Sequence, residues 1–229
     1  MFLNGYGPLV LAGLMMTLKL ALLAMIGAFL LGLVGAGCKL SRSRGLRALG
    51  AGYTTVIRSV PDLVMMLLLF YSLQIWLNRL TDALGWAQID IDPFSAGVIT
   101  LAVIYGAYFT ETFRGAFAAV HRGQIEAALA YGMPPWTLFR RVLFPQMMRH
   151  ALPGIGNNWQ VMIKATALVS LIGLNDLIKA TQDAGKGSGQ FFYFSILSAL
   201  IFLALATVIN LAVLLLERRF SAGTRRHAA

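Results

Sequence analysis

Residues 20–37 read "LALLAMIGAFLLGLVGAG", an uninterrupted apolar run without a charged or amide side chain. An α-helix needs about 20 such residues to cross the hydrocarbon core of a bilayer. Ala28, Gly32 and Ala36 are spaced four residues apart within the run, and small residues at this spacing let two membrane helices approach closely. The run therefore predicts a membrane-spanning helix that packs tightly against a second helix.

The remainder of the chain has the same apolar character. Of its 229 residues, 58% are hydrophobic and only 12% are charged, about half the charged share of a soluble domain. We therefore expect an all-α integral membrane protein that forms a single transmembrane domain over residues 1–229. Five segments are long and apolar enough to span a bilayer: residues 8–37, 60–77, 94–120, 152–178 and 191–216.

Basic residues cluster beside alternate spans, which predicts the orientation of the chain. The loops at the opposite ends of the spans hold only three basic residues, Arg79, Lys179 and Lys186, and the glycine-rich stretch at 183–190 there is expected to be a flexible loop. The positive-inside rule then places the N-terminus outside and the C-terminus inside. The net charge of +10 reflects this topology, and no nucleic-acid-reading motif accompanies it. The expected cytoplasmic set is Lys39, Arg42, Arg44, Arg47, Arg58, Arg114, Arg122, Arg140, Arg141, Arg149, Arg218, Arg219, Arg225 and Arg226.

The fourth expected span is more polar than the others. Asn157, Gln160, Lys164 and Asn175 fall near one face at helical spacing. A helix with such a face is too polar to lie against lipid on all sides. We therefore expect this span to line a protein interior or a water-filled path.

Residues 121–150 form an unusual cytoplasmic segment that reads "IEAALAYGMPPWTLFRRVLFP" over residues 125–145. The pattern predicts a short helix with Glu126 in its first turn, a backbone turn at Gly132, and a second helix opened by the proline pair at 134–135. Arg140 suits the end of that helix, and Pro145 is expected to close the unit. The segment is either a plain connection or, because Leu138 and Phe139 beside Trp136 are expected to be exposed next to basic residues, a docking site for a soluble partner.

The spacing within this segment resembles the EAA motif of permease subunits of bacterial ABC importers. Val and Phe stand where that motif has Ile and Leu. The resemblance extends over nearly the whole chain to polar amino-acid permeases, and is nearest to the Q-type permeases of histidine/lysine/arginine/ornithine transporters. It is carried by residues 58–71, 105–128 and 152–182 and by Glu126, Ala127, Ala128, Gly132, Val142, Phe144 and Pro145.

The resemblance implies a type I importer permease fold in the bacterial inner membrane, with a cytoplasmic coupling helix. It also implies a second, identical or homologous permease, two ABC ATPase subunits, and a periplasmic solute-binding protein that delivers the substrate. ATP and Mg²⁺ would be bound by the ATPases, so this chain is expected to have no cofactor and no enzymatic activity. Glu126, Ala127, Ala128, Gly132, Arg140 and Pro145 are the implied contacts to the ATPase.

Substrate contacts are expected among ionisable groups inside the membrane, where a charge costs about 2.5–3.5 kcal/mol. A basic amino acid such as arginine, lysine, histidine or ornithine requires carboxylates. Asp62 is one candidate, although the Ser59–Asp62 spacing also fits a capping box that merely starts a helix. Asp176, near the outer end of the fourth span, either contacts substrate or pairs with Lys179.

Glu111 is the remaining acidic candidate, and it has a structural alternative. It lies three residues before Arg114, a spacing that favours a helical ion pair, and Lys164 is another possible partner. Tyr105, Tyr108 and Thr112 share its helical face and together predict a polar wall. The expected substrate-binding set is Asp62, Tyr108, Glu111, Asn158, Gln160 and Asp176.

Two other functional classes remain open from the residues alone. A stand-alone, ion-coupled carrier would use Asp62 or Glu111 to bind a proton, and a purely structural membrane subunit would have no substrate path. A metal enzyme is not indicated, because His121, His150 and His227 have no metal-ligand spacing and Cys38 has no companion.

Overall fold

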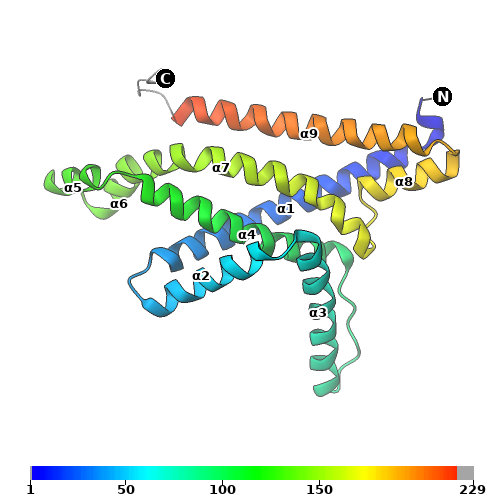
Figure 1. Ribbon diagram of the computed structural model, residues 1–229, viewed down its shortest axis with the longest axis horizontal. Coiled ribbons are helices and arrows are strands. Elements are labelled where there is room, and N and C mark those ends of the chain that lie inside the picture. The colour runs from blue at the N-terminus through cyan, green and yellow to red at the C-terminus, as the bar shows by residue number, and fades with distance from the viewer. Residues whose placement is uncertain (1, 221–229) are drawn as a thin grey trace.

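The computed structural model describes residues 2–220, and all regular elements in that range are helices, as predicted (Figure 1). Arg225 and Arg226, expected on the cytoplasmic side, lie outside the described residues. Three short elements, Phe2–Gly5, a π-helical turn at Phe139–Leu143 and a 3₁₀ helix at Thr166–Ile172, accompany the α-helices. These are α1 (Gly7–Leu40), α2 (Arg44–Ser59), α3 (Asp62–Ala83), α4 (Pro93–Ala119), α5 (Arg122–Ala130), α6 (Pro135–Leu138), α7 (Phe144–Ala165), α8 (Leu177–Ser188) and α9 (Phe191–Phe220).

Four helices among the described residues are long and apolar enough to cross a membrane: α1, α3, α4 and α9. They correspond to the first, second, third and fifth expected spans. The fourth expected span is instead a broken helix, in which Pro135–Ile172 and Leu177–Ser188 meet at 58°. The break occurs at Gly173, whose φ of 98° lies in the left-handed region that glycine adopts without strain.

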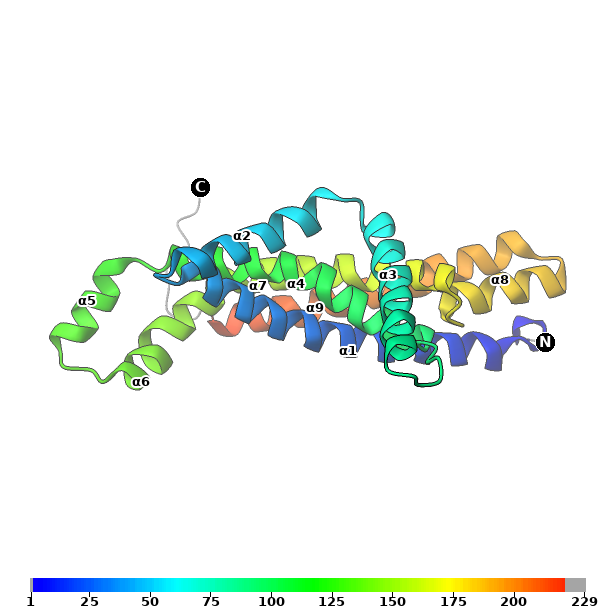
Figure 2. The ribbon, with the colours of Figure 1, turned by 90° about the horizontal axis from the view of Figure 1, so that it is seen from below.

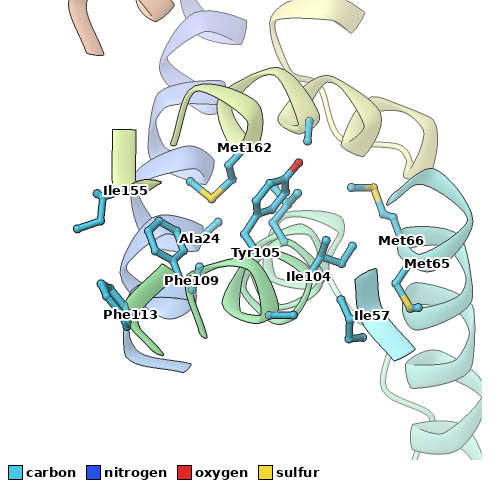
Figure 3. Close-up of a cluster of buried hydrophobic side chains, with 14 of the residues drawn as sticks. Ala24, Ile57, Met65, Met66, Ile104, Tyr105, Phe109, Phe113, Ile155 and Met162 are labelled. Carbon is cyan, nitrogen blue, oxygen red and sulfur yellow. The ribbon is translucent and has the colours of Figure 1, made fainter. Parts of the chain in front are cut away.

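The centre of the molecule is the contact between α1 and α4, with α7 and α9 running alongside (Figures 1 and 2). Ala28 and Ala36 are buried there, as their spacing predicted. Phe109 and Phe113 of α4 pack over this small-residue face of α1, and Met162 of α7 closes the core from the other side (Figure 3). Close approach of the helix backbones and large aromatic side chains thus hold α1, α4 and α7 together by van der Waals packing.

Residues 44–59 form the helix α2, although the positions of the expected spans predicted a cytoplasmic loop there. This helix returns along α1 and α4 and presents a narrow buried face that contains Gly50, Thr54 and Ile57. It ends at Ser59, because the next residue, Val60, precedes Pro61, and a following proline disfavours a helical conformation. The chain then changes direction, and α3 projects away from the other helices (Figure 1).

Helix α8 packs against the N-terminal half of α1. The hydroxyl of Thr17 accepts a hydrogen bond from the backbone N–H of Leu177 at 3.0 Å. Gly13 lets the two helices touch, because a Cβ there would lie 2.7 Å from the Cβ of Ala180. The glycine-rich stretch at 183–190, expected to be a flexible loop, is helical up to Ser188, since this packing holds it in place.

Candidate functional site

Asp62 is the first residue of α3 and faces two tyrosines of α4. Its Oδ2 accepts a hydrogen bond from the hydroxyl of Tyr105 at 3.0 Å, and its Oδ1 lies 3.5 Å from the hydroxyl of Tyr108. The two rings stack with centroids 5.5 Å apart. The expected capping box is absent, because Pro61 occupies the N-cap and the hydroxyl of Ser59 donates to the carbonyl of Thr55.

The carboxylate of Asp62 has hydroxyl donors but no counter-cation. Within residues 2–220 it forms no ion pair. The guanidinium of Arg58 lies beside this cluster, over the ring of Tyr108, with its Cζ 5.2 Å from the ring centroid. The tyrosine–aspartate cluster, defined as Asp62, Tyr105 and Tyr108, therefore holds a carboxylate in place with two hydroxyl groups, and a carboxylate can pair with a cation.

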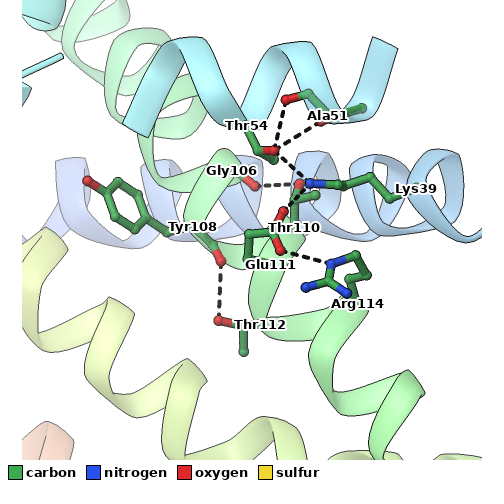
Figure 4. A network of polar contacts seen from close by, with 10 residues as sticks. Lys39, Ala51, Thr54, Gly106, Tyr108, Thr110, Glu111, Thr112 and Arg114 are labelled. Carbon is green, nitrogen blue, oxygen red and sulfur yellow. Dashed lines mark hydrogen bonds and ion pairs between the residues drawn. The ribbon is translucent and has the colours of Figure 1, made fainter. Parts of the chain in front are cut away.

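Glu111 has a different environment, and both of its oxygens are occupied (Figure 4). Its Oε2 accepts from Arg114 at 2.8 Å, which confirms the expected helical ion pair. Its Oε1 accepts from Lys39, in the last turn of α1, and Lys39 also donates to Thr54 of α2 at 2.8 Å. The alternative partner Lys164 forms no ion pair among the described residues, so the network joins α1, α2 and α4 instead.

The side chains of the expected polar wall on α4 therefore contact three different helices, α1, α3 and α7. Tyr105 and Tyr108 turn to Asp62, whereas Glu111 turns to Lys39. Thr112 accepts a hydrogen bond from the amide of buried Asn158 on α7 at 3.0 Å. The amide of Asn158 thus bridges α4 and α7, which places it in a helix contact.

The polar face of α7 is partly open. Asn157 and Lys164 are exposed in the isolated chain. Gln160 lies with its Nε2 3.5 Å from Oδ1 of Asn210 on α9, beside a shallow depression of about 280 Å³ that also includes Thr207. Exposed amides within a membrane-spanning helix need another protein chain or water as hydrogen-bond partners, because lipid offers none.

Asp176 was expected to contact substrate or to pair with Lys179. The structure does not show the ion pair: Lys179 lies 3.4 Å from Asp183 instead. The fully buried Asp176 is the N-cap of α8, where its Oδ1 accepts from the backbone N–H of Lys179 at 2.9 Å. Its Oδ2 is buried without a hydrogen-bond partner. Capping after the helix break accounts for its position.

The segment after α4 contains the two short helices that the sequence predicted, α5 and α6. Gly132 turns the chain between them with φ 71°, as expected. Glu126 is exposed, but it is not in the first turn of α5, because that helix begins at Arg122. The ring of His121 caps this helix by accepting from the N–H of Gly123 at 3.2 Å.

The second prediction about this segment, that Pro145 closes it, is wrong. The helical chain continues from α6 through the π-helical turn into α7, and Pro145 lies at the start of α7 instead of ending the segment. Leu138, expected to be exposed, is buried.

The outer surface of this segment still carries apolar and basic groups. We define the docking surface by its exposed residues: Glu126, Ala127, Leu129, Tyr131, Trp136, Arg140 and Arg141. Ala128 is buried against the rest of the segment. The segment extends beyond the long helices at one end of the molecule (Figures 1 and 2).

Sequence reasoning did not identify Lys39, Thr54 or Arg58 as parts of these clusters. The available signal was the amphipathic spacing of residues 44–59, which predicts a helix rather than a loop. Within residues 2–220 no group of His, Cys, Asp and Glu side chains could hold a metal ion.

Comparisons of this chain with known proteins all indicate one family of membrane transport proteins. The family model described as "Binding-protein-dependent transport system inner membrane component" matches residues 28–222. The histidine/lysine/arginine/ornithine transport system permease HisQ of Salmonella typhimurium is 60% identical over 98% of both chains. The nopaline transport system permease NocQ of Agrobacterium fabrum is 40% identical, over 96% of this chain and 94% of the relative.

A solved structure shows the same arrangement of helices. A chain of an amino acid ABC transporter, crystallised with histidines, superposes with a TM-score of 0.77 at 34% identity, over 93% of this chain and 95% of that one. The ion-coupled alternative finds no support in any of these likenesses.

Proposed function

Because the chain belongs to the family of binding-protein-dependent transport system inner membrane components, as a permease of amino-acid ABC importers, we propose that it moves basic amino acids and that Asp62 recognises their cationic side chains. Arginine, lysine, histidine and ornithine are the candidates, since the relative HisQ is named for them. Transport proceeds by alternating access, in which each state of the assembly binds substrate with a different affinity.

The observation that carries the proposal is the carboxylate of Asp62, which forms no ion pair among the described residues. Tyr105 and Tyr108 orient it by hydrogen bonds but supply no charge. A buried or half-buried charge in a membrane protein needs a partner or a function. A guanidinium or ammonium group from the substrate would pair with this carboxylate through a charge-assisted hydrogen bond.

Glu111, by contrast, is proposed as a structural residue. Lys39 and Arg114 already neutralise it, so a cationic substrate would have to displace one of them. Asn158 and Asp176 have structural roles in a helix bridge and a helix cap. Of the other residues expected to contact substrate, Tyr108 is proposed to act together with Asp62, and Gln160 lies on the open face of α7.

A second permease subunit, identical or homologous, is proposed to cover this open face. Asn157, Gln160 and Lys164 cannot all remain against lipid, and a dimer would enclose them together with water and substrate. The support is the exposure of Asn157 and Lys164 on an otherwise packed helix. The path would then run between the two α7 helices.

The docking surface is proposed to bind one of two ABC ATPase subunits, which would bind ATP and Mg²⁺; a periplasmic binding protein would load the opposite end. The support is an exposed aromatic and basic surface on a compact helical segment at one end of the molecule. The basic side chains concentrate toward this end, which by the positive-inside rule faces the cytoplasm of a bacterial inner membrane.

Uptake of labelled arginine, lysine and histidine by the assembled importer in proteoliposomes tests the proposal. Asp62→Asn keeps the shape and hydrogen bonding but removes the charge. Loss of a charge-assisted contact of about 1.5–3 kcal/mol predicts uptake about 10- to 100-fold slower at low substrate.

The matched control is Asp92→Asn, because Asp92 is an exposed carboxylate that caps α4 away from the cluster. Its uptake should stay near the parent value, and the Asp62 variant should still assemble and bind ATP. Normal uptake of all three substrates by Asp62→Asn would refute the assignment of Asp62.

A further inference from the structure

An apolar groove lies between α1 and α2, at the end of α1 that carries Lys39. Its volume is about 240 Å³. The only polar lining side chain, Tyr53, has its hydroxyl engaged, since it donates to the carbonyl of Val103 at 2.6 Å. An occupant of this groove therefore has to be apolar. The lining residues are Leu31, Val34, Gly35, Cys38, Leu49, Gly50 and Tyr53.

The groove exists because Gly50 brings α2 close to α1 without a side chain that would fill the space between them. A Cβ on Gly50 would lie 2.7 Å from Cγ of Lys39, so α2 rests directly on α1. The rim is open, with Val34 and Leu49 both largely exposed. Part of the groove wall, on α1, belongs to a helix long and apolar enough to span the membrane. An open apolar groove on such a helix contacts acyl chains unless another protein covers it.

The chain beside the groove is strongly basic. Arg42, Arg44 and Arg47 lie in the turn after α1 and the first turn of α2, and all three are exposed. No acidic residue occurs between Lys39 and Val60, and none of these arginines forms an ion pair within the described range. Lys39 does not add to this charge, because Glu111 neutralises it.

We propose that this groove, with the basic turn at its end, binds an anionic phospholipid of the cytoplasmic leaflet. One acyl chain lies between α1 and α2, and the phosphate-bearing headgroup lies against Arg42 and Arg44. Attraction to anionic headgroups gains roughly fivefold in affinity for each basic residue near the surface, and acyl burial adds to it. The proposal depends only on the membrane location and not on the substrate assignment.

Photocrosslinking of the assembled importer in phosphatidylcholine nanodiscs tests the proposal. A minor fraction of phosphatidylglycerol carries a diazirine on one acyl chain, and digestion with mass spectrometry locates the labelled residues. We expect label on residues 31–53. Arg42→Gln combined with Arg44→Gln should lower the apparent affinity by about 30-fold, and Val34→Trp, which fills the groove from its exposed rim, should abolish label there.

The matched control is Arg218→Gln combined with Arg219→Gln. It removes the same charge from the end of α9, away from the groove, and should leave the label on residues 31–53 unchanged. Three outcomes would overturn the proposal: equal labelling by diazirine-bearing phosphatidylcholine, equal loss in both arginine pairs, or no label because the second permease covers the groove.

Discussion

The network around Glu111 gives a prediction whose magnitude follows from burial. Lys39 and Glu111 have side chains only 17% and 20% exposed, whereas Arg114 is 41% exposed. Breaking a fully buried pair costs about 3–5 kcal/mol, and an exposed pair contributes about 0–1 kcal/mol. Lys39→Met should therefore destabilise the chain by about 2–3 kcal/mol, because Glu111 keeps Arg114. Arg114→Met should cost less than about 1 kcal/mol.

Reversible unfolding in mixed detergent and dodecyl sulfate micelles, followed by tryptophan fluorescence, measures these free energies. A double-mutant cycle of Lys39→Met and Glu111→Gln should give a coupling of about 2 kcal/mol. Lys179→Met is the control, because its pair with Asp183 is 3.4 Å long and about 40% exposed; it should change stability by less than about 0.5 kcal/mol.

The reasoning also predicts which variants transport. If Glu111 is structural, Glu111→Gln should lower the amount of folded importer while leaving uptake per folded complex near the parent value. Two results would refute this account: a coupling between Lys39 and Glu111 no larger than the stability change of the Lys179→Met control, or a Glu111→Gln importer that is stable but does not transport basic amino acids.

Three further substitutions probe other contacts. Thr17→Val should destabilise the chain by about 1–3 kcal/mol in the same unfolding assay, because the buried N–H of Leu177 loses its acceptor; Thr207→Val, exposed on α9, should not. Gly132→Ala should cost roughly 1–2 kcal/mol through its left-handed φ of 71° and should reduce ATPase stimulation by loaded binding protein, whereas normal stimulation would count against the docking surface. Tyr105→Phe should raise the KM for arginine by about 3- to 10-fold, since Asp62 loses one orienting hydrogen bond, and an unchanged KM would separate this tyrosine from recognition.

Local pattern was sufficient for the membrane class and the positions of the long helices. Bilayer thickness sets the length of an apolar helix, so α1, α3, α4 and α9 could be located from hydropathy. The pair of short helices around Gly132 was also readable, because proline and glycine act within a few residues of their position. The same reasoning misplaced Pro145, since a proline in a first turn and a proline that ends a unit look alike in sequence.

The partners within the polar clusters could not be predicted from local sequence pattern. Lys39 and Glu111 are separated by 72 positions, and Asp62 and Tyr105 by 43. The sequence by itself determined which residues enter the membrane, because transfer from water to lipid depends on each segment alone. Only the tertiary structure decided that Glu111 pairs with two cations and Asp62 with two tyrosine hydroxyls, because the partner of a buried charge depends on how packed helices are rotated against one another.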